Sequence, residues 1–290
     1  MKKLTIFLMI LFFAISAGIL VKDNFPGLGN YFEKNLQNFQ KSDLGITLNE
    51  VKKEVFAPSP LNVGGKPNQV VLISQKIIAQ TNIQRFNNNL TIPLIENSLL
   101  TAAAKAKAED MFKNQYFEHI SPSGVDPGAL VKNHGYDYIV TGENLILGNF
   151  EDEKELVQLW MDSPGHRANI LNERFTEIGV AVVKGTYKGE IVWIGVQEFG
   201  LPLSACRQPD ASLKNKIDSN KIRLDSLALQ IEAKRQEIEN TNKRSPEYNI
   251  LVNEHNRLVA EYNQLNDQTK NYIIQYNQQI NIFNQCVEGS

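Results

Sequence analysis

Between residues 69 and 201, apolar residues recur at three- or four-residue intervals in some stretches and fill strand-length runs in others. The helical spacing predicts one helix that begins near Gln69 and carries Asn82 and Arg85, and two more over residues 97–114 and 151–162. Strand-like runs cover residues 138–140, 178–184 and 190–199, and a glycine-bounded turn separates the last two. Helices mixed with antiparallel strands predict an α+β unit.

A different pattern fills residues 202–290, where apolar residues fall on alternating three- and four-residue steps. The first stripe runs from Leu213 to Ile238, and Ser245-Pro246 then interrupts the helical pattern. In the second stripe, a Tyr-Asn pair or a close variant returns on a seven-residue register. Two apolar heptad stripes joined by one tight turn predict an antiparallel coiled-coil hairpin.

The two cysteines of the chain, Cys206 and Cys286, stand at the outer ends of the two predicted helical arms. Because antiparallel folding brings these ends together, a Cys206–Cys286 disulfide is predicted. Such a bond persists in an oxidising compartment, which an exported chain reaches. Two cysteines this far apart also exclude a cysteine-rich metal cluster.

The first 22 residues have the pattern of an export signal. A pair of lysines precedes an apolar run from Leu4 to Val21, and this order favours an orientation with the amino terminus inside the cell. As a helix, the run would span about 27 Å, enough to cross the hydrocarbon core of a bilayer. Small residues at Ala14 and Ser16 also form a cleavage-site pattern. Residues 1–22 therefore fit either a cleaved signal peptide or a membrane anchor, and the apolar residues past Ser16 favour the anchor.

Residues 23–68 are rich in Gly, Pro, Asn and Lys and have little regular apolar spacing, so they are interpreted as a linker. The predicted order is thus a signal or anchor (1–22), a linker (23–68), a globular domain (69–201) and the hairpin (202–290). The formal net charge is −2 and the pI about 6.1. Without a basic excess to bind phosphates, nucleic acid is not an expected partner.

Several motifs in the central region carry residue types that are common at binding sites. They are Asn82 with Arg85, Tyr116–Gly124, Gly142–Leu145, Trp160–Asn172, Thr176–Val180 and Gln197–Gly200. Through these residues the region resembles the CAP superfamily (cysteine-rich secretory proteins, antigen 5 and plant pathogenesis-related class 1 proteins), and more closely its bacterial secreted branch. The resemblance implies a three-layer α-β-α sandwich with one open cleft.

In that family, two histidines and two acidic residues line the cleft. His119, Glu143 and His166 match three of these positions, motif by motif. The resemblance implies a glutamate three residues after the helix tryptophan as the fourth. Ser163 holds that place here, and Asp162 stands one residue earlier on a different helix face.

Two imidazoles and a carboxylate in a common cleft are ligand types that zinc or another divalent cation accepts. In this interpretation His119 and His166 bind the metal, with Glu143 and also Asp162 as candidates to complete the site. Glu143 has two alternative roles: it orients a metal-bound histidine, or it ties a loop to neighbouring backbone N–H groups. A small polar or lipidic ligand fits the same three residues.

A serine nucleophile is disfavoured, because Ser163 begins a Ser-Pro-Gly turn typical of helix ends and no Gly-x-Ser-x-Gly sequence occurs. The leading hypothesis is an exported cell-surface protein that binds a metal ion or an extracellular ligand or protein at His119, Glu143 and His166, with binding favoured over catalysis. The alternative is a metal-dependent peptidase or other hydrolase that uses the same residues. A third hypothesis assigns the function to the hairpin, as an arm that docks another protein or the cell wall.

Overall fold

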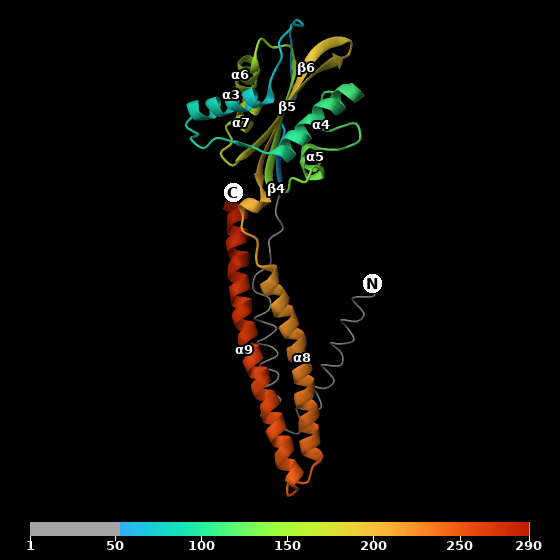
Figure 1. The fold of residues 1–290 in the computed structure, drawn as a ribbon, viewed down its shortest axis with the longest axis vertical. Helices are drawn as coiled ribbons and strands as arrows, with labels where there is room; N and C mark the ends of the chain where they lie inside the picture. The colour runs from blue at the N-terminus through green and yellow to red at the C-terminus, as the bar shows by residue number, and fades with distance from the viewer. Residues whose placement is uncertain (1–52, 290) are drawn as a thin grey trace. The chain divides into compact units, whose positions relative to one another are not determined.

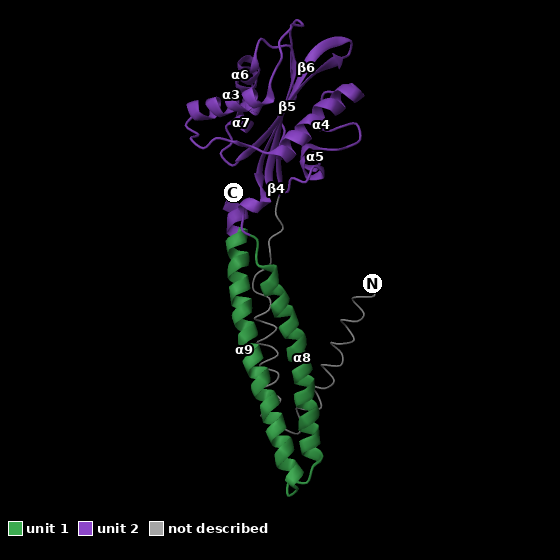
Figure 2. Cartoon of the chain, in the orientation of Figure 1, with its two compact units in different colours: residues 1–48, 208–284 green, residues 49–207, 285–290 purple. Residues whose placement is uncertain are grey.

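The computed structural model describes residues 53–289, which divide into two compact units (Figure 2). The sandwich unit contains residues 53–207 and 285–289, and the hairpin contains residues 208–284. The predicted signal or anchor, residues 1–22, lies outside the described residues. Within residues 53–289, no helix is both long enough and apolar enough to cross a membrane.

A mixed sheet forms the centre of the sandwich unit (Figure 1). Three long strands, β4, β6 and β5, are neighbours in that order and run antiparallel. Short strands extend the sheet in parallel at its edges, where β1 and β2 pair with β4 and β3 pairs with β5. The strands are β1 Glu54–Phe56, β2 Leu61–Gly64, β3 Ile95–Glu96, β4 Tyr138–Gly148, β5 Glu177–Tyr187 and β6 Glu190–Pro202.

Helices cover both faces of this sheet, which confirms the predicted α+β, three-layer sandwich. Figure 1 shows α4 and α5 on one face and α3, α6 and α7 on the other. The helices are α3 Ser74–Asn87, α4 Ser98–Asn114, α5 Pro127–Asn133, α6 Glu153–Asp162 and α7 Pro164–Ile170. The helices predicted over residues 97–114 and 151–162 are therefore present as α4 and α6.

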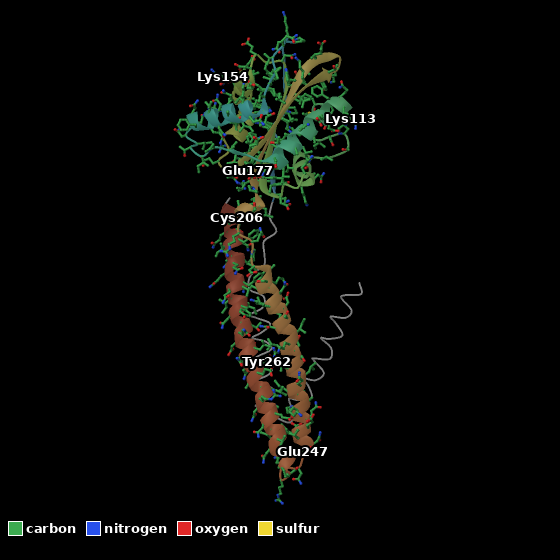
Figure 3. The ribbon with its side chains drawn as sticks, viewed as in Figure 1. Lys113, Lys154, Glu177, Cys206, Glu247 and Tyr262 are labelled. Atoms are coloured by element: carbon green, nitrogen blue, oxygen red, sulfur yellow. A yellow bond between two sulfur atoms is a disulfide. The ribbon has the colours of Figure 1, made fainter. Side chains whose placement is uncertain are left out.

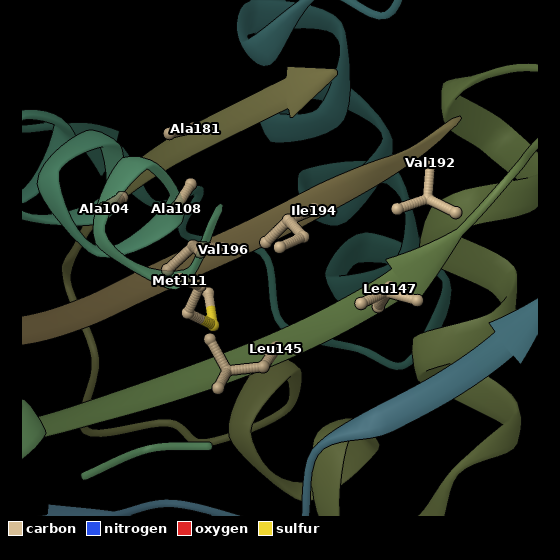
Figure 4. Packing of buried hydrophobic residues seen from close by; sticks show 9 residues of the cluster. All are labelled: Ala104, Ala108, Met111, Leu145, Leu147, Ala181, Val192, Ile194 and Val196. Carbon is tan, nitrogen blue, oxygen red and sulfur yellow. The ribbon is translucent and has the colours of Figure 1, made fainter. Parts of the chain in front are cut away.

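The face of the sheet beneath α4 is packed with apolar side chains (Figure 4). The buried residues of this cluster are Ala104, Ala108, Met111, Leu145, Leu147, Ala181, Val192, Ile194 and Val196. Side chains alternate between the two faces of a strand, so Leu145 and Leu147 share the α4 face with Glu143. The same alternation along β6 puts Glu198 on that face with Val196. The carboxyl groups of Glu143 and Glu198 therefore lie on the same face of the sheet as this apolar cluster, next to it along the strands.

Two differences from the sequence interpretation bear on the site. Residues 54–64, assigned above to a linker, contribute β1 and β2 to the edge of the sheet. These strands are short and flanked by prolines, so their apolar pattern is weak, and they are held by pairing with the distant β4. The strand predicted over residues 138–140 extends to Gly148, which puts Glu143 inside β4 rather than in a loop.

The hairpin consists of α8, Ala211–Asn240, and α9, Pro246–Gly289. Residues near the start of α8 cluster with a residue late in α9: Leu213, Ile217 and Ile273. Further along α8, the cluster includes earlier residues of α9: Leu224, Leu227, Ile231, Leu258 and Leu265. The two helices therefore pack antiparallel, through residues that the apolar stripes predict.

The predicted disulfide is confirmed. Cys206 follows the short 3₁₀ helix η1, Leu203–Ala205, and its sulfur is bonded to that of Cys286 in α9. Figure 3 labels Cys206 within the sandwich unit, and Cys286 belongs to the same unit. The bond closes a loop that contains the whole hairpin.

Candidate functional site

His119 lies in the loop after α4, and both of its ring nitrogens have partners. Nδ1 lies 2.6 Å from Oε1 of Glu143 in β4. Nε2 contacts the backbone carbonyl oxygen of Pro58, between β1 and β2. Because a carbonyl oxygen can only accept, Nε2 carries a hydrogen, and a second hydrogen lies between Nδ1 and Glu143. Glu143 thus fixes the ring so that one N–H points at Pro58.

A second carboxyl group, that of Glu198, lies beside Glu143. The two residues are directly opposite in the β4–β6 ladder, and neither side chain is accessible to solvent. Burial raises the pKa of Glu198 well above its ordinary value, the neighbouring Glu143 raises it further, and Lys107 acts in the opposite direction. Two ionised carboxylates directly opposite each other in a sheet repel and lower stability. Glu198 is therefore the neutral, proton-carrying member of the pair.

Lys107 supports this pair from α4. Its side chain is buried, and Nζ donates to the backbone carbonyl oxygen of His119 at 2.5 Å. Burial lowers the pKa of Lys107, while nearby carboxylates, led by Glu143 and Glu198, partly restore it. A buried ammonium requires such partners. Lys107 therefore ties the His119 loop to α4 and balances the carboxyl pair.

His166 approaches the same strand from the opposite face of the sheet. It lies in α7, and Nδ2 of Asn144 donates to its backbone oxygen at 3.1 Å. In the side chain, Nδ1 lies 2.8 Å from Oγ of Ser163, and Nε2 is buried without a well-aligned partner among the described residues. Burial lowers the pKa of His166 to about 4, the charge of His119 lowers it too, and a backbone contact with Leu145 acts in the opposite direction. His166 is therefore neutral at neutral pH.

Residues 54–64, which we call the cover segment, lie along β4 between the two histidines. Besides the Pro58–His119 contact, Nδ2 of Asn169 in α7 lies 3.3 Å from the backbone oxygen of Phe56. A Cβ atom at Gly165 would lie only 2.7 Å from Cβ of Pro58. The segment therefore rests directly on the start of α7.

The structure brings three of the four predicted site residues together and separates the fourth. Glu143 pairs with His119, and the charge of His119 reaches His166. Asp162 is exposed at the end of α6 and accepts a hydrogen bond from Gln158 at 2.8 Å, so it points along its own helix. The expected open cleft is covered: the side chain of His119 is 12% exposed and that of Glu143 0%.

The observed arrangement does not fit the predicted zinc or other divalent cation. Both nitrogens of His119 have protein partners, and Ser163 occupies Nδ1 of His166. In the described part of the chain, no group of three or more His, Cys, Asp or Glu side chains could hold a metal ion. The Ser163–His166 contact also lacks an orienting carboxylate, because Glu143 binds His119 instead.

Three residues of the site were given no role there by sequence reasoning: Lys107, Pro58 and Glu198, although Glu198 stands in the Gln197–Gly200 motif. Two signals were available. Lys107 stands on the apolar stripe of its helix, between Ala104 and Met111, and a lysine there must be paired when buried. Glu198 interrupts an apolar strand. Pro58 gave no signal, because its role depends on pairing with a strand some eighty residues away.

Comparison with known proteins identifies the sandwich unit. The family model for CAP, the cysteine-rich secretory protein family, matches residues 88–199. The uncharacterized protein YkwD of Bacillus subtilis is 40% identical over 118 residues, which are 41% of this chain and 45% of YkwD. The uncharacterized membrane protein YlbC of the same organism is 32% identical over 114 residues, 39% of this chain and 32% of YlbC. The chain thus spans less than half the length of these relatives.

Among solved structures, an extracellular protein containing an SCP domain from Bacillus anthracis is similar at 32% identity. The match covers 44% of this chain and 39% of that chain, with a TM-score of 0.38. The family model falls on the unit that holds His119, Glu143 and His166. Residues 88–199 of the sandwich unit are therefore a CAP domain of the bacterial kind, and the unit is called the CAP domain below.

Proposed function

We propose that this chain is an exported binding protein whose CAP domain holds a polar ligand by a hydrogen-bond acceptor atom, through the Nε2–H group of His119. The observation that carries the proposal is the pairing of His119 with Glu143 on one nitrogen and with a backbone carbonyl on the other. A ring fixed from behind by a buried carboxylate is a preorganised donor.

The surrounding charges support binding rather than proton transfer. His166, the other histidine, is a weak base because burial lowers its pKa to about 4. Glu198 keeps its proton because burial raises its pKa. A weak base and a carboxyl group that favours its neutral form are poor partners for proton transfer, so the site acts as a set of donors and acceptors.

Export is part of the proposal. The apolar run behind Lys2 and Lys3 and the Cys206–Cys286 disulfide suit a chain that leaves the cytoplasm. The similar protein YlbC is described as a membrane protein. The site would then meet a ligand outside the cytoplasm, at the cell surface or beyond it.

The test is an NMR titration of the full chain with labelled histidine. The chain has four histidines, so each ring can be assigned. Acetate, inorganic phosphate and N-methylacetamide serve as small acceptor probes. We expect at least one probe to shift the His119 Nε2 signal saturably, and Glu143→Gln to weaken that response because the ring loses its orienting partner. The ring of His134, just after α5, lies 2.9 Å from the backbone oxygen of Leu130, so His134→Gln is the matched control and should respond like the unaltered chain.

A zinc titration under the same conditions separates the alternative. If zinc binds and is lost from both His119→Ala and His166→Ala, the site is a metal site and the acceptor proposal is wrong. If no probe moves the His119 signal, the proposal fails for small ligands of every class tested.

A further inference from the structure

We propose that the cover segment occupies the site as a built-in ligand, and that the ligand it imitates is an extended polypeptide laid parallel to β4. This inference rests on the proposed function and names the class of ligand. Intramolecular occupation keeps an otherwise unpaired sheet edge closed until a competing peptide arrives.

The first argument is the pairing of the cover segment with β4. The β1 pairing ends with Phe56 opposite Gly142, and the β2 pairing begins with Leu61 opposite Ile146. Between them, residues 57–60 pass the part of β4 that contains Glu143 without forming ladder pairs. Pro58 and Pro60 have no N–H to donate, so only their carbonyl groups can bond there. The segment thus crosses the site as an interrupted parallel strand.

The second argument is that the domain contacts the backbone of the segment. His119 contacts the carbonyl oxygen of Pro58, and Asn169 lies 3.3 Å from that of Phe56. These carbonyls are two residues apart, a spacing at which an extended chain points them the same way. Contacts to backbone atoms tolerate many side chains, which is how sheet-edge sites accept peptides.

The third argument concerns shape at one position. Gly165 lies against Pro58, and any Cβ there would overlap the ring, with a separation of 2.7 Å. The missing side chain leaves a space that a proline ring fills. We therefore expect the preferred peptide to carry proline at the position of Pro58.

The fourth argument is that the cover segment is weakly held. None of residues 53–64 is fully buried, whereas every residue of β4 beneath it is. Val55 is 43% exposed and Phe56 37%. Its other attachments include the Glu54–Arg174 ion pair at 2.8 Å, an edge contact between Phe56 and Phe175, and a hydrogen bond from the N–H of Asn149 to the carbonyl oxygen of Gly64 at 2.7 Å. The segment therefore buries little apolar surface of its own.

The experiment uses a labelled peptide with the sequence of residues 54–64, added to the full chain. In the host chain, Glu54→Gln with Phe56→Ala loosens the cover segment, while the peptide keeps both native residues. Only molecules whose cover segment has left the site can bind the peptide, so the apparent affinity is proportional to the fraction of such molecules. We therefore expect the loosened chain to bind the peptide about tenfold more tightly than the unaltered chain. Each single variant should give an intermediate value, which guards against an unfolded double variant.

Two further changes test the geometry in the loosened background. Gly165→Ala should abolish peptide binding by meeting the proline ring, and His119→Ala should weaken it by removing the donor. A peptide of reversed sequence should bind at least tenfold more weakly than the native one. Equal binding of the native peptide to the loosened and unaltered chains, or of both peptides to the loosened chain, overturns the inference. If acetate, phosphate or N-methylacetamide still shifts His119 while the peptide does not bind, the proposed function survives and only the peptide assignment is lost.

Discussion

The hairpin and the CAP domain bury different kinds of side chain. In the hairpin, the buried positions are mostly leucine and isoleucine, and within residues 208–284 the buried polar residues are Asn266, Thr269 and Asn284. In the CAP domain, buried charged or titratable residues are frequent: Arg85, Lys107, Glu143, Glu153, His166 and Glu198. Apolar burial stabilises a helix pair directly, whereas a buried charge costs free energy unless it is paired.

This difference indicates which unit carries a binding site. The ion pairs of the hairpin lie on its surface, as between Arg223 and Glu261, where such pairs contribute little. The CAP domain instead keeps Glu143 and Glu198 side by side in its core. Buried ionisable groups of this kind lower stability, and they cluster at functional sites.

The largest expected effect separates the two units through the disulfide. Cys206→Ser with Cys286→Ser opens a loop with a sequence separation of 80, which by loop entropy lowers the free energy of unfolding by roughly 4.5 kcal/mol. We expect the loss to fall on the hairpin, because the closed loop consists of it. Far-ultraviolet circular dichroism in urea follows α8 and α9, and fluorescence follows Trp160 and Trp193, the two tryptophans, both in the CAP domain.

If the urea midpoints from circular dichroism and from tryptophan fluorescence fell by the same amount, the expectation would be wrong and the two units would unfold together. The single variants Cys206→Ser and Cys286→Ser are the controls. Each leaves one thiol but opens the same loop, so each should reproduce the double variant.

The hairpin could be predicted from the sequence because its contacts follow a local period. Leu251 and Leu258 are seven residues apart and both face α8, so the spacing itself identifies the seam. The α4 and α6 helices were predictable for the same reason. Predicting these helices required only the spacing of apolar residues within a local stretch of sequence.

The site was predictable only in part, because its contacts are not local. His119, Glu143 and His166 lie in motifs that resemble those of a known family. The pairing of Glu143 with Glu198, however, depends on the register between two strands. The contact between Pro58 and His119 depends on which strand of the sheet pairs with the short, proline-flanked cover segment. A local apolar period indicates which face of a strand is buried, but it does not indicate which residue of a distant strand lies opposite.

The next effect concerns pH and should be confined to the CAP domain. The pKa of His166 is lowered to about 4 in the folded chain, below the ordinary value of about 6.5. The contribution of neutral His166 is therefore complete above about pH 6.5 and is lost as the pH falls through 4. A shift of this size corresponds to up to about 3 kcal/mol. The tryptophan-detected free energy of unfolding should decline over this range, more steeply than in His166→Asn.

His134→Gln is the control for this measurement. His134 is partly exposed, outside the carboxyl cluster, and its ring hydrogen-bonds to the backbone oxygen of Leu130 in the adjoining helix α5. His134→Gln should leave unchanged the slope of the free energy of unfolding against pH. A slope that is the same in His166→Asn as in the unaltered chain would show that other groups cause the decline.

The smallest effect tests the proton on Glu198, and its sign is opposite. Because the folded pKa of Glu198 is raised, its contribution is complete below the ordinary glutamate value and is lost as the pH rises through the folded pKa. Glu198→Gln keeps the shape and the neutral state, so at pH 5 it should change the free energy of unfolding by less than about 1 kcal/mol. At higher pH the variant should become the more stable chain. Glu153 is the matched control, since its carboxylate accepts from the N–H of Ile73 at 3.0 Å and lies near Lys76, and Glu153→Gln should bring no gain at high pH. If Glu198→Gln were destabilising at every pH, Glu198 rather than Glu143 would be the ionised member of the pair.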